Sequence, residues 1–310
     1  MIFLRWHDKR YNTLNYFFRD TFGEKVAKIS LNAGFSCPNR DGTLSYEGCV
    51  FCGEGSGYYD ELIGLSITEQ FYEYKKRIDN KWANIKYIAY FQAYTNTYKD
   101  VESLRKIYYE AINIKDVVGI SIATRPDCLS DEILELLAEI RKKTFVFVEL
   151  GFQTSKEESV KLINRLYDNK IYDDAVNNLN KIGINIITHV ILGLPHETKE
   201  DMLNTIKYIC RNPFHGVKLQ LLHVVKNTKL CDMYKNKLFE TLELNEYLDI
   251  VVSCLEVLPP EIVVHRINGD CPEEFLIAPK YCLNKRNILN GVDKLLVQRD
   301  SFQGKFFEKL

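Results

Sequence analysis

Short apolar runs of strand type alternate with amphipathic segments of helical type along most of this chain. The apolar runs begin near residues 26, 86, 117, 145, 184, 217 and 261. Between them apolar side chains recur at helical spacing, and after Ser130 the stripe comprises Ile133, Leu136, Leu137 and Ile140. This alternation predicts βαβ units that build a parallel sheet with right-handed crossovers. An open doubly wound sheet and a partial or full barrel both satisfy the pattern.

Polar residues stand where the predicted strands end. These strand ends are residues 92–96, 124–127, 149–154, 189–197, 220–223 and 265–270. In parallel β/α architectures functional residues gather at the carboxyl ends of the strands, so we expect these segments to line one cavity. Such a cavity indicates a binding site and does not identify a reaction.

Three cysteines follow the first predicted strand. Cys37, Cys49 and Cys52 stand at Cys-x11-Cys-x2-Cys, and turn formers such as Pro38 and Gly42 lie between them. Three thiolates are one fewer than the four that close a structural zinc site or an ordinary iron–sulfur site. The pattern is consistent with a cluster that keeps one open position, with a zinc knuckle completed by a distant ligand, or with three unrelated buried thiols.

The composition is that of an ordinary globular protein. The chain has 310 residues, of which 46% are hydrophobic and 27% charged, enough for a large core. An odd count of nine cysteines favours free thiols in a reducing compartment over a disulfide framework. The sequence contains no apolar run of about 18 residues and no hydrophobic signal core. We therefore expect a cytoplasmic protein without membrane contact.

Positive charge is concentrated at the two ends, although the formal net charge is −1. Residues 1–30 hold six Lys or Arg against three Asp or Glu, and residues 280–310 hold seven against three. Both ends also carry aromatic residues. Basic and aromatic side chains together suit an RNA backbone with stackable bases. Solvated termini with a few core aromatics explain the same composition.

Longer motifs, placed on this alternation, identify a family resemblance. They are ATRPDCL (123–129), ELGFQT (149–154) with Arg165, HVILGLPHET (189–198) and VVHRINGDCP (263–272). With the cysteine loop they resemble the radical S-adenosylmethionine (SAM) superfamily. The wide first cysteine gap is similar to that of the branch containing the catalytic subunit of Elongator. Over nearly its whole length the chain resembles a bacterial family of radical SAM enzymes that act on tRNA wobble uridine.

The resemblance implies a [4Fe–4S] cluster and SAM as cofactors. Cys37, Cys49 and Cys52 would bind three irons, and the fourth iron would bind the amino and carboxylate groups of SAM. The residues that the resemblance places around SAM are Phe51, Gln92, Arg125, Gln153, Arg165, His189 and Gly193. Among these, Phe51 would pack on the adenine, and Arg165 would pair the carboxylate. The structural alternatives are a surface arginine at 165, a satisfied core histidine at 189 and a simple turn at 193.

Some positions depart from the pattern of the family or have no assigned partner. The second strand end lacks the usual Gly-Gly-Glu-like segment, and His189 stands where relatives often carry an acid. Arg125 either lines the cavity or pairs with Asp127. The candidates for substrate contact are His265, Arg266 and Asp270, with Arg266 on a phosphate or carboxylate.

The implied fold is an α/β, partial (β/α)6-type radical SAM barrel. It would span residues 25–270, with a basic and aromatic extension at residues 1–24 and a basic extension at 271–310 packed on the barrel. The implied reaction is reductive cleavage of SAM to a 5′-deoxyadenosyl radical, which takes hydrogen from a modified wobble uridine of tRNA. Loss of the carboxymethyl arm would convert 5-carboxymethylaminomethyl-(2-thio)uridine into 5-aminomethyl-(2-thio)uridine.

The implied partners are tRNA, an electron donor such as flavodoxin or ferredoxin, and a tRNA methyltransferase that completes the modification. Two alternatives remain at this point. One is a radical SAM enzyme that acts on a small molecule or peptide, and the other is a zinc-holding RNA-binding protein without catalytic activity.

Overall fold

The computed structural model of the protein describes residues 6–53, 62–80, 82 and 85–308. Its main feature is a seven-stranded sheet in which all neighbouring strands are parallel. Across the sheet the strands are β1 (Val26–Leu31), β2 (Lys86–Phe91), β3 (Val117–Thr124), β4 (Phe145–Gln153), β5 (Asn185–Leu192), β6 (Gly216–Leu221) and β8 (Val263–Arg266). The seven predicted strands are therefore confirmed.

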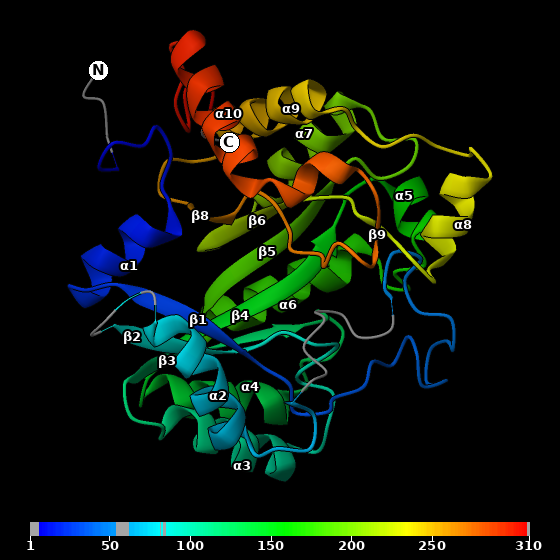
Figure 1. Ribbon diagram of the computed structural model, residues 1–310. Helices are drawn as coiled ribbons and strands as arrows, with labels where there is room; N and C mark the ends of the chain where they lie inside the picture. Colours follow the sequence, from blue (N-terminus) through cyan, green and yellow to red (C-terminus); the bar gives the residue numbers. More distant parts are fainter. Residues whose placement is uncertain (1–5, 54–61, 81, 83–84, 309–310) are drawn as a thin grey trace.

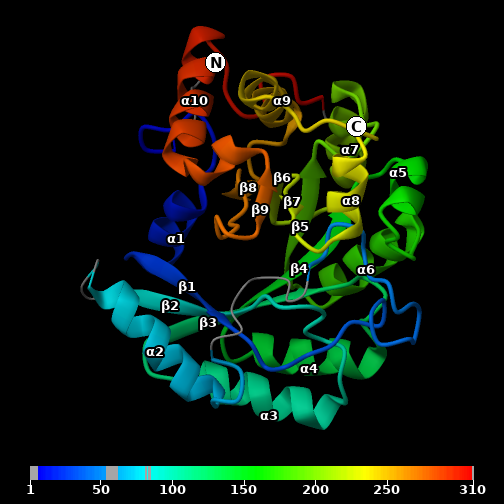
Figure 2. The same cartoon turned by 45° about the vertical axis from the view of Figure 1, so that its right-hand side comes forward.

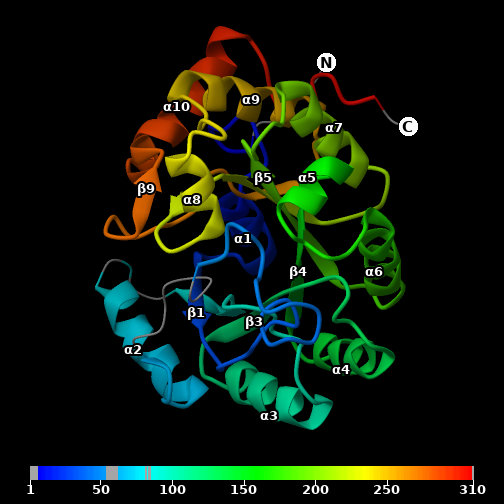
Figure 3. The same cartoon turned by 90° about the vertical axis from the view of Figure 1, so that its right-hand side faces the viewer.

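The sheet curls into a half-barrel, and helices cover its outer face (Figure 1, Figure 3). The covering helices are α2 (Ile67–Asp79), α3 (Val101–Ile112), α4 (Asp131–Arg141), α6 (Asn169–Lys181), α7 (Lys199–Ile209) and α9 (Leu244–Val257). The helices α2, α3 and α4 lie together at one side of the molecule, and α7, α9 and α10 (Lys285–Gln298) lie together at the other (Figure 2). The apolar stripe predicted after Ser130 is the buried face of α4. The architecture confirms the partial barrel and excludes an open doubly wound sheet.

The inner face of the sheet changes character along each strand. Because successive residues of a strand point to opposite faces, Phe147, Glu149 and Gly151 of β4 all face the barrel interior. Phe147 packs against Phe17 and Phe18 of helix α1 (Leu14–Phe22) in an apolar layer. Glu149 and Gly151 line a cavity instead. The interior therefore passes from an apolar layer, closed by α1, to a polar cavity at the carboxyl ends of the strands.

Both terminal segments pack on the barrel. Helix α1 contacts β1 and β8, and α10 packs against α9. The backbone N–H of Asn12 donates to the side-chain oxygen of Gln303 at 2.8 Å, which joins the two ends of the chain. The shorter elements are α5 (Glu157–Leu162), α8 (Lys229–Lys235), η2 (Lys280–Leu283) and the antiparallel pair β7 (Val224–Val225) and β9 (Leu276–Ala278). Residues 1–5 and 309–310 of the two predicted extensions lie outside the described residues.

Several aromatic residues of the N-terminal segment belong to the core. Trp6, Tyr11 and Phe18 are buried, whereas Phe306 near the other end is 57% exposed. Packing thus accounts for these N-terminal aromatics without RNA, which favours the structural explanation of that part of the composition.

Within the described residues, none of the helices is both long enough and apolar enough to cross a membrane.

Candidate active site

The carboxyl ends of the strands surround a cavity of about 310 Å³. The predicted site residues that line it are Cys37, Cys49, Phe51, Cys52, Gln92, Arg125, Gln153, Arg165, His189, Arg266 and Asp270. Gly193 and His265 do not belong to this lining. The polar strand ends therefore meet in one cavity, as the alternation of elements predicts.

Two turns shape the loop from Cys37 to Cys52. The N–H groups of Arg40 and Asp41 both donate to the carbonyl of Cys37, at 2.8 and 3.2 Å, directly after the first cysteine. The N–H of Cys52 donates to the carbonyl of Cys49 at 2.9 Å. These turns fold the loop so that its three thiols line the same cavity.

Two asparagines fasten the cysteine loop to the segment after β4. The amide nitrogen of Asn39 donates to the carbonyl of Asn164 at 2.7 Å, and that of Asn164 donates to the carbonyl of Gly48 at 2.8 Å. The Asn39 amide nitrogen also lies 3.5 Å from Cys49 Sγ, where a donor favours the thiolate form. Neither asparagine was identified from the sequence, because their facing positions depend on the tertiary fold.

The three thiols suit a metal cluster. Burial raises the pKa of Cys49 and of Cys52, while the guanidinium of Arg125 acts in the opposite direction on both. A coordinated metal ion deprotonates such thiols outright. In the described part of the chain, no three His, Cys, Asp or Glu side chains are arranged to hold a single metal ion. An iron–sulfur cluster binds each thiolate to a different iron, so three thiols that line one cavity can bind three irons and leave the fourth iron with an open position.

Arg125 both pairs with Asp127 and lines the cavity, so the two alternatives are not exclusive. Its Nε and Nη2 atoms donate to the two carboxylate oxygens of Asp127 at 2.9 and 2.7 Å. This fork is the bidentate geometry that guanidinium groups prefer. The guanidinium also lies 4.8 Å from the ring centroid of Tyr167.

Arg165 is almost fully buried and holds the backbone after β4. Its Nη1 donates to the carbonyls of Phe152 and Thr154 at 2.5 and 2.9 Å, and its Nε donates to the carbonyl of Tyr167 at 3.0 Å. Its Nη2 donates to the side chain of Asn169 at 2.8 Å. Four of its five N–H groups are therefore used within the chain. Arg165 is not a surface arginine, and its main contacts shape the wall of the cavity.

Lysine at position 165 should lower the free energy of unfolding by about 2–3 kcal/mol. The single ammonium group of lysine cannot make the four hydrogen bonds that the buried, planar guanidinium of Arg165 makes. Urea unfolding of Arg165→Lys measures this loss. The matched control is Arg141→Lys, since Arg141 is an exposed arginine that donates to the carbonyl of Gly183 at 2.5 Å. Equal, small effects of the two substitutions would contradict this role of Arg165.

Two of the residues predicted around SAM, Gln153 and Gly193, have a backbone in the left-handed region. Gln153 ends β4 with a φ of 65° and lines the cavity. Gly193 has a φ of 87°, and a Cβ at this position would lie 2.8 Å from Leu242 Cδ1. The turn and this close approach account for the glycine without a ligand.

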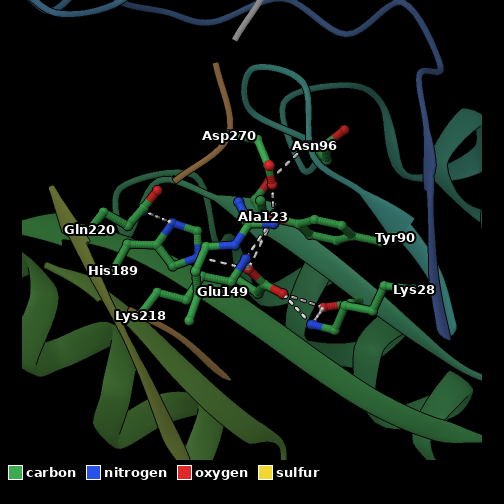
Figure 4. A network of polar contacts seen from close by, with 11 residues as sticks. Lys28, Tyr90, Asn96, Ala123, Glu149, His189, Lys218, Gln220 and Asp270 are labelled. Atoms are coloured by element: carbon green, nitrogen blue, oxygen red, sulfur yellow. Dashed lines mark hydrogen bonds and ion pairs between the residues drawn. The ribbon is translucent and has the colours of Figure 1, made fainter. Parts of the chain in front are cut away.

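A buried carboxylate, which was not singled out from the sequence, lies at the centre of the barrel (Figure 4). The Glu149 side chain has no exposed surface. Its contacts are with Lys28 Nζ (2.7 Å), Lys218 Nζ, Ser121 Oγ (2.6 Å), Tyr90 Oη (3.1 Å) and His189 Nε2 (2.6 Å). Burial alone would raise the pKa of Glu149, but the charges of Lys218 and Lys28 hold it well below its usual value.

His189 belongs to the same network. Burial and the charge of Lys218 lower its pKa to about 4, so its imidazole is neutral at pH 7. Its Nδ1 lies 3.4 Å from the side-chain amide of Gln220. His189 is thus a satisfied core residue that also lines the cavity. A sequence pattern was available for this network, since Lys28, Glu149 and Lys218 are each the one charged residue of a largely apolar strand.

The structure separates the three candidates for substrate contact. Arg266 and Asp270 line the main cavity and form an ion pair at 3.0 Å. His265 does not line the main cavity. It lines a second cavity of about 390 Å³ beside α1, to which Arg266 also contributes. Its ring packs edge-on against the ring of Phe147, with the two centroids 5.3 Å apart. The centroid of the His265 ring lies 5.9 Å from that of the His215 ring. Burial lowers the pKa of His265 well below its usual value, so it is a neutral member of the apolar layer.

The chain is similar to known proteins over nearly its whole length. A family model described as the Radical SAM superfamily matches residues 37–209, and a Radical_SAM C-terminal domain model matches residues 214–298. The protein YtqA of Bacillus subtilis (strain 168) is 45% identical over 304 residues, which cover 98% of this chain and 94% of that protein. The tRNA-2-methylthio-N(6)-dimethylallyladenosine synthase of Thermotoga petrophila is 30% identical over 148 residues, 47% of this chain and 33% of that protein.

A solved structure has the same fold. It is Elp3 of the archaeon Methanocaldococcus infernus, with an N-terminal deletion, and it superposes with a TM-score of 0.69 at 18% sequence identity. The superposition covers 90% of this chain and 64% of that one.

Proposed function

The chain belongs to the radical SAM superfamily, and we propose that it acts on tRNA, where it converts 5-carboxymethylaminomethyl-(2-thio)uridine at the wobble position into 5-aminomethyl-(2-thio)uridine. Enzymes of this superfamily use a [4Fe–4S] cluster and SAM. When bound, these groups supply a 5′-deoxyadenosyl radical that abstracts hydrogen from an unactivated C–H bond. The protein's own contribution is to hold the cofactors, orient the substrate and exclude competing reactants.

Cys37, Cys49 and Cys52 would hold the cluster, and the cavity beside them would hold SAM. The residues available there for SAM are Phe51, Gln92, Arg125, Gln153, Arg165 and His189. Phe51 offers an apolar surface to the adenine, and Gln153 offers an amide to the ribose. Because most N–H groups of Arg165 are engaged with the chain, its role would be to fix the wall against which SAM lies.

Cationic side chains in the main cavity support a substrate that carries negative charge. The cavity that contains the three thiols is also lined by Lys218 and Arg266, so the reacting centre shares one space with cationic groups. The arm of the proposed substrate ends in a carboxylate, and the nucleotide itself carries phosphates. Arg266 and Asp270, the two partners of one ion pair, would both contact the nucleotide.

Removal of the arm follows from the loss of one hydrogen atom. Abstraction from the carbon between the amine nitrogen and the carboxylate leaves a carbon radical. Loss of an electron to a protein carrier of the flavodoxin or ferredoxin class, and of a proton, gives an imine. Water then adds to the imine carbon, the C–N bond breaks, and the products are the aminomethyl nucleoside and glyoxylate.

An RNA substrate is supported by the similarity to a protein named as a tRNA-modifying synthase. A wobble nucleotide lies in a loop, so it can be flipped into a cavity at a modest cost in stacking. Contacts to phosphates make such binding weaker at higher salt. A tRNA methyltransferase would then act on the amine that this reaction produces.

The proposal predicts a specific conversion in vitro. Anaerobically reconstituted protein, supplied with SAM and a reductant, should convert tRNA that carries the 5-carboxymethylaminomethyl group. Mass spectrometry of the digested nucleosides should show 5-aminomethyluridine, with 5′-deoxyadenosine and glyoxylate formed in equal amounts. Formation of 5′-deoxyadenosine without a change in any tRNA nucleoside would contradict a tRNA substrate and favour a small molecule or peptide.

A further inference from the structure

Two lysines share one carboxylate inside the barrel. Lys28 Nζ lies 2.7 Å from Glu149 Oε1, and Lys218 Nζ contacts Glu149 Oε2. The side chains are 15% exposed for Lys28, 5% for Lys218 and 0% for Glu149. His189 adds no charge, because its pKa is lowered to about 4. The group therefore carries an excess of one positive charge when both lysines are protonated.

An unbalanced charge in a buried site is costly unless a partner of opposite sign reaches it. At the mouth of the cavity Arg266 already pairs with Asp270, and Lys285 pairs with the same carboxylate. Those groups do not compensate the interior. The excess charge around Glu149 is the kind that an anionic ligand neutralises.

Lys218 is the cation that this ligand can reach. It lines both the main cavity and the second cavity beside α1, whereas Lys28 lines the second cavity alone. Its ammonium has three donors. Two of them serve Glu149 and the hydroxyl of Tyr90, the latter at 2.8 Å, and the ammonium lies 4.6 Å from the centroid of the Tyr90 ring. Among the described residues no hydrogen bond uses the third donor.

We propose that Lys218 binds a carboxylate of the substrate inside the barrel. If the proposed function holds, this carboxylate is the end of the carboxymethyl arm, so that identification rests on the proposed function. The ion pair would anchor the arm at its far end. Its carbon next to the amine nitrogen would thereby be held at a fixed place in the cavity that also contains the three thiols.

The titration of Lys218 supports this role. Burial lowers the pKa of Lys218 to about 7, although Glu149 acts to raise it. A bound carboxylate would stabilise the charged ammonium, so binding should be accompanied by proton uptake and should weaken as the pH rises above 7. The titratable and charged groups that surround Lys218 are Lys28, Tyr90, Glu149, His189, His265 and Arg266.

The test compares two anticodon stem-loops that differ by the carboxylate alone. One carries 5-carboxymethylaminomethyluridine at the wobble position and the other 5-methylaminomethyluridine. Their affinities for anaerobic, cluster-loaded protein are measured by fluorescence anisotropy. In the native protein the carboxylate should improve binding roughly 10- to 100-fold, as expected for a charge-assisted contact. Lys218→Met should remove most of that preference.

Lys28→Met is the matched control, since it removes the other lysine on the same carboxylate. It should keep the preference to within about threefold, because surrounding charges contribute less than the direct contact. The affinity for SAM alone is measured in parallel, because SAM also carries a carboxylate. Lys218→Met should leave the affinity for SAM unchanged.

The possible failures are distinguishable. The assignment would be overturned if Lys218→Met preferred the carboxylate-bearing stem-loop as strongly as the native protein does. It would also be overturned if Lys28→Met lost as much of that preference as Lys218→Met. A selective loss of SAM affinity would assign Lys218 to SAM instead. Failure of both stem-loops to bind the native protein would contradict the proposed function itself, and with it the identification of the arm. Should Lys218→Met not fold, the native protein decides: its preference should fall between pH 6 and pH 9, and a constant preference would overturn the assignment.

Discussion

Alanine at Cys37, Cys49 or Cys52 should reduce SAM cleavage by more than about 100-fold, since losing even an outer contact of a metal site costs on the order of 10- to 100-fold. Each thiol would bind a different iron, and the remaining two cannot hold a cluster with one open position. Iron and sulfide content after anaerobic reconstitution, with the yield of 5′-deoxyadenosine, measures the loss.

Cys128→Ala is the matched control for these variants. The Cys128 thiol stands 3.7 Å from Asp127 Oδ1, and it belongs neither to the loop nor to the lining of the main cavity. This variant should keep its iron and its SAM cleavage. The assignment fails if Cys128→Ala is as damaging as Cys49→Ala, or if alanine at any of the three loop positions leaves both readouts intact.

Glutamine at position 149 should lower the free energy of unfolding by about 3–5 kcal/mol, because two buried lysine side chains lose the carboxylate that they share. Since the pKa of Glu149 is held well below its usual value, this stability is present above the pKa of an unfolded glutamate. It is lost only as the pH falls through the lower folded value. Denaturant unfolding at pH 7 and at progressively lower pH measures both effects.

Glu197→Gln is the control for the loss of a buried carboxylate. Glu197 accepts from the hydroxyl of Thr154 at 2.5 Å, and burial raises its pKa, so an amide should replace it at a cost of about 1 kcal/mol or less. The double variant Glu149→Gln/Lys218→Met should recover part of the stability, because it replaces one of the two buried lysines that lost their partner with an apolar side chain. A cost below about 1 kcal/mol for Glu149→Gln would show that the lysines do not depend on this carboxylate.

The sequence was sufficient for the order of the elements and for the position of the cavity. Apolar runs with β-branched residues mark the strands, and helical periodicity marks α4, because both patterns arise locally from burial of one face. The polar strand ends then follow from parallel topology, and they do line one cavity. The spacing of Cys37, Cys49 and Cys52 was informative because their loop is short and rich in turn formers.

The inner and outer faces of the strands could not be assigned from the sequence. A parallel strand is buried on both sides, so its pattern of apolar residues does not tell which face points into the barrel. This ambiguity concealed the convergence of Lys28, Glu149 and Lys218, which come from three separate strands. The depth of a side chain along the barrel is equally hidden in the sequence. His265 stands at a polar strand end next to Arg266, but it packs on Phe147 in the apolar layer.

Arg165 and Asn39 illustrate a second limit. Their partners are backbone carbonyls of a neighbouring loop, and a carbonyl leaves no trace in the sequence. A side chain that serves the backbone therefore has the same appearance as one that serves a ligand. The resemblance of the motif placed Arg165 near SAM, and only the structure showed how many of its donors are already engaged.

The measurement that tests the account most directly follows one hydrogen atom. A stem-loop carrying 5-carboxymethylaminomethyluridine is labelled with deuterium on the carbon between the amine nitrogen and the carboxylate, and is treated with reconstituted protein, SAM and reductant. We expect deuterium to appear in 5′-deoxyadenosine in step with the formation of 5-aminomethyluridine. Unlabelled 5′-deoxyadenosine, formed while the arm is lost or while the nucleoside stays unchanged, would contradict it.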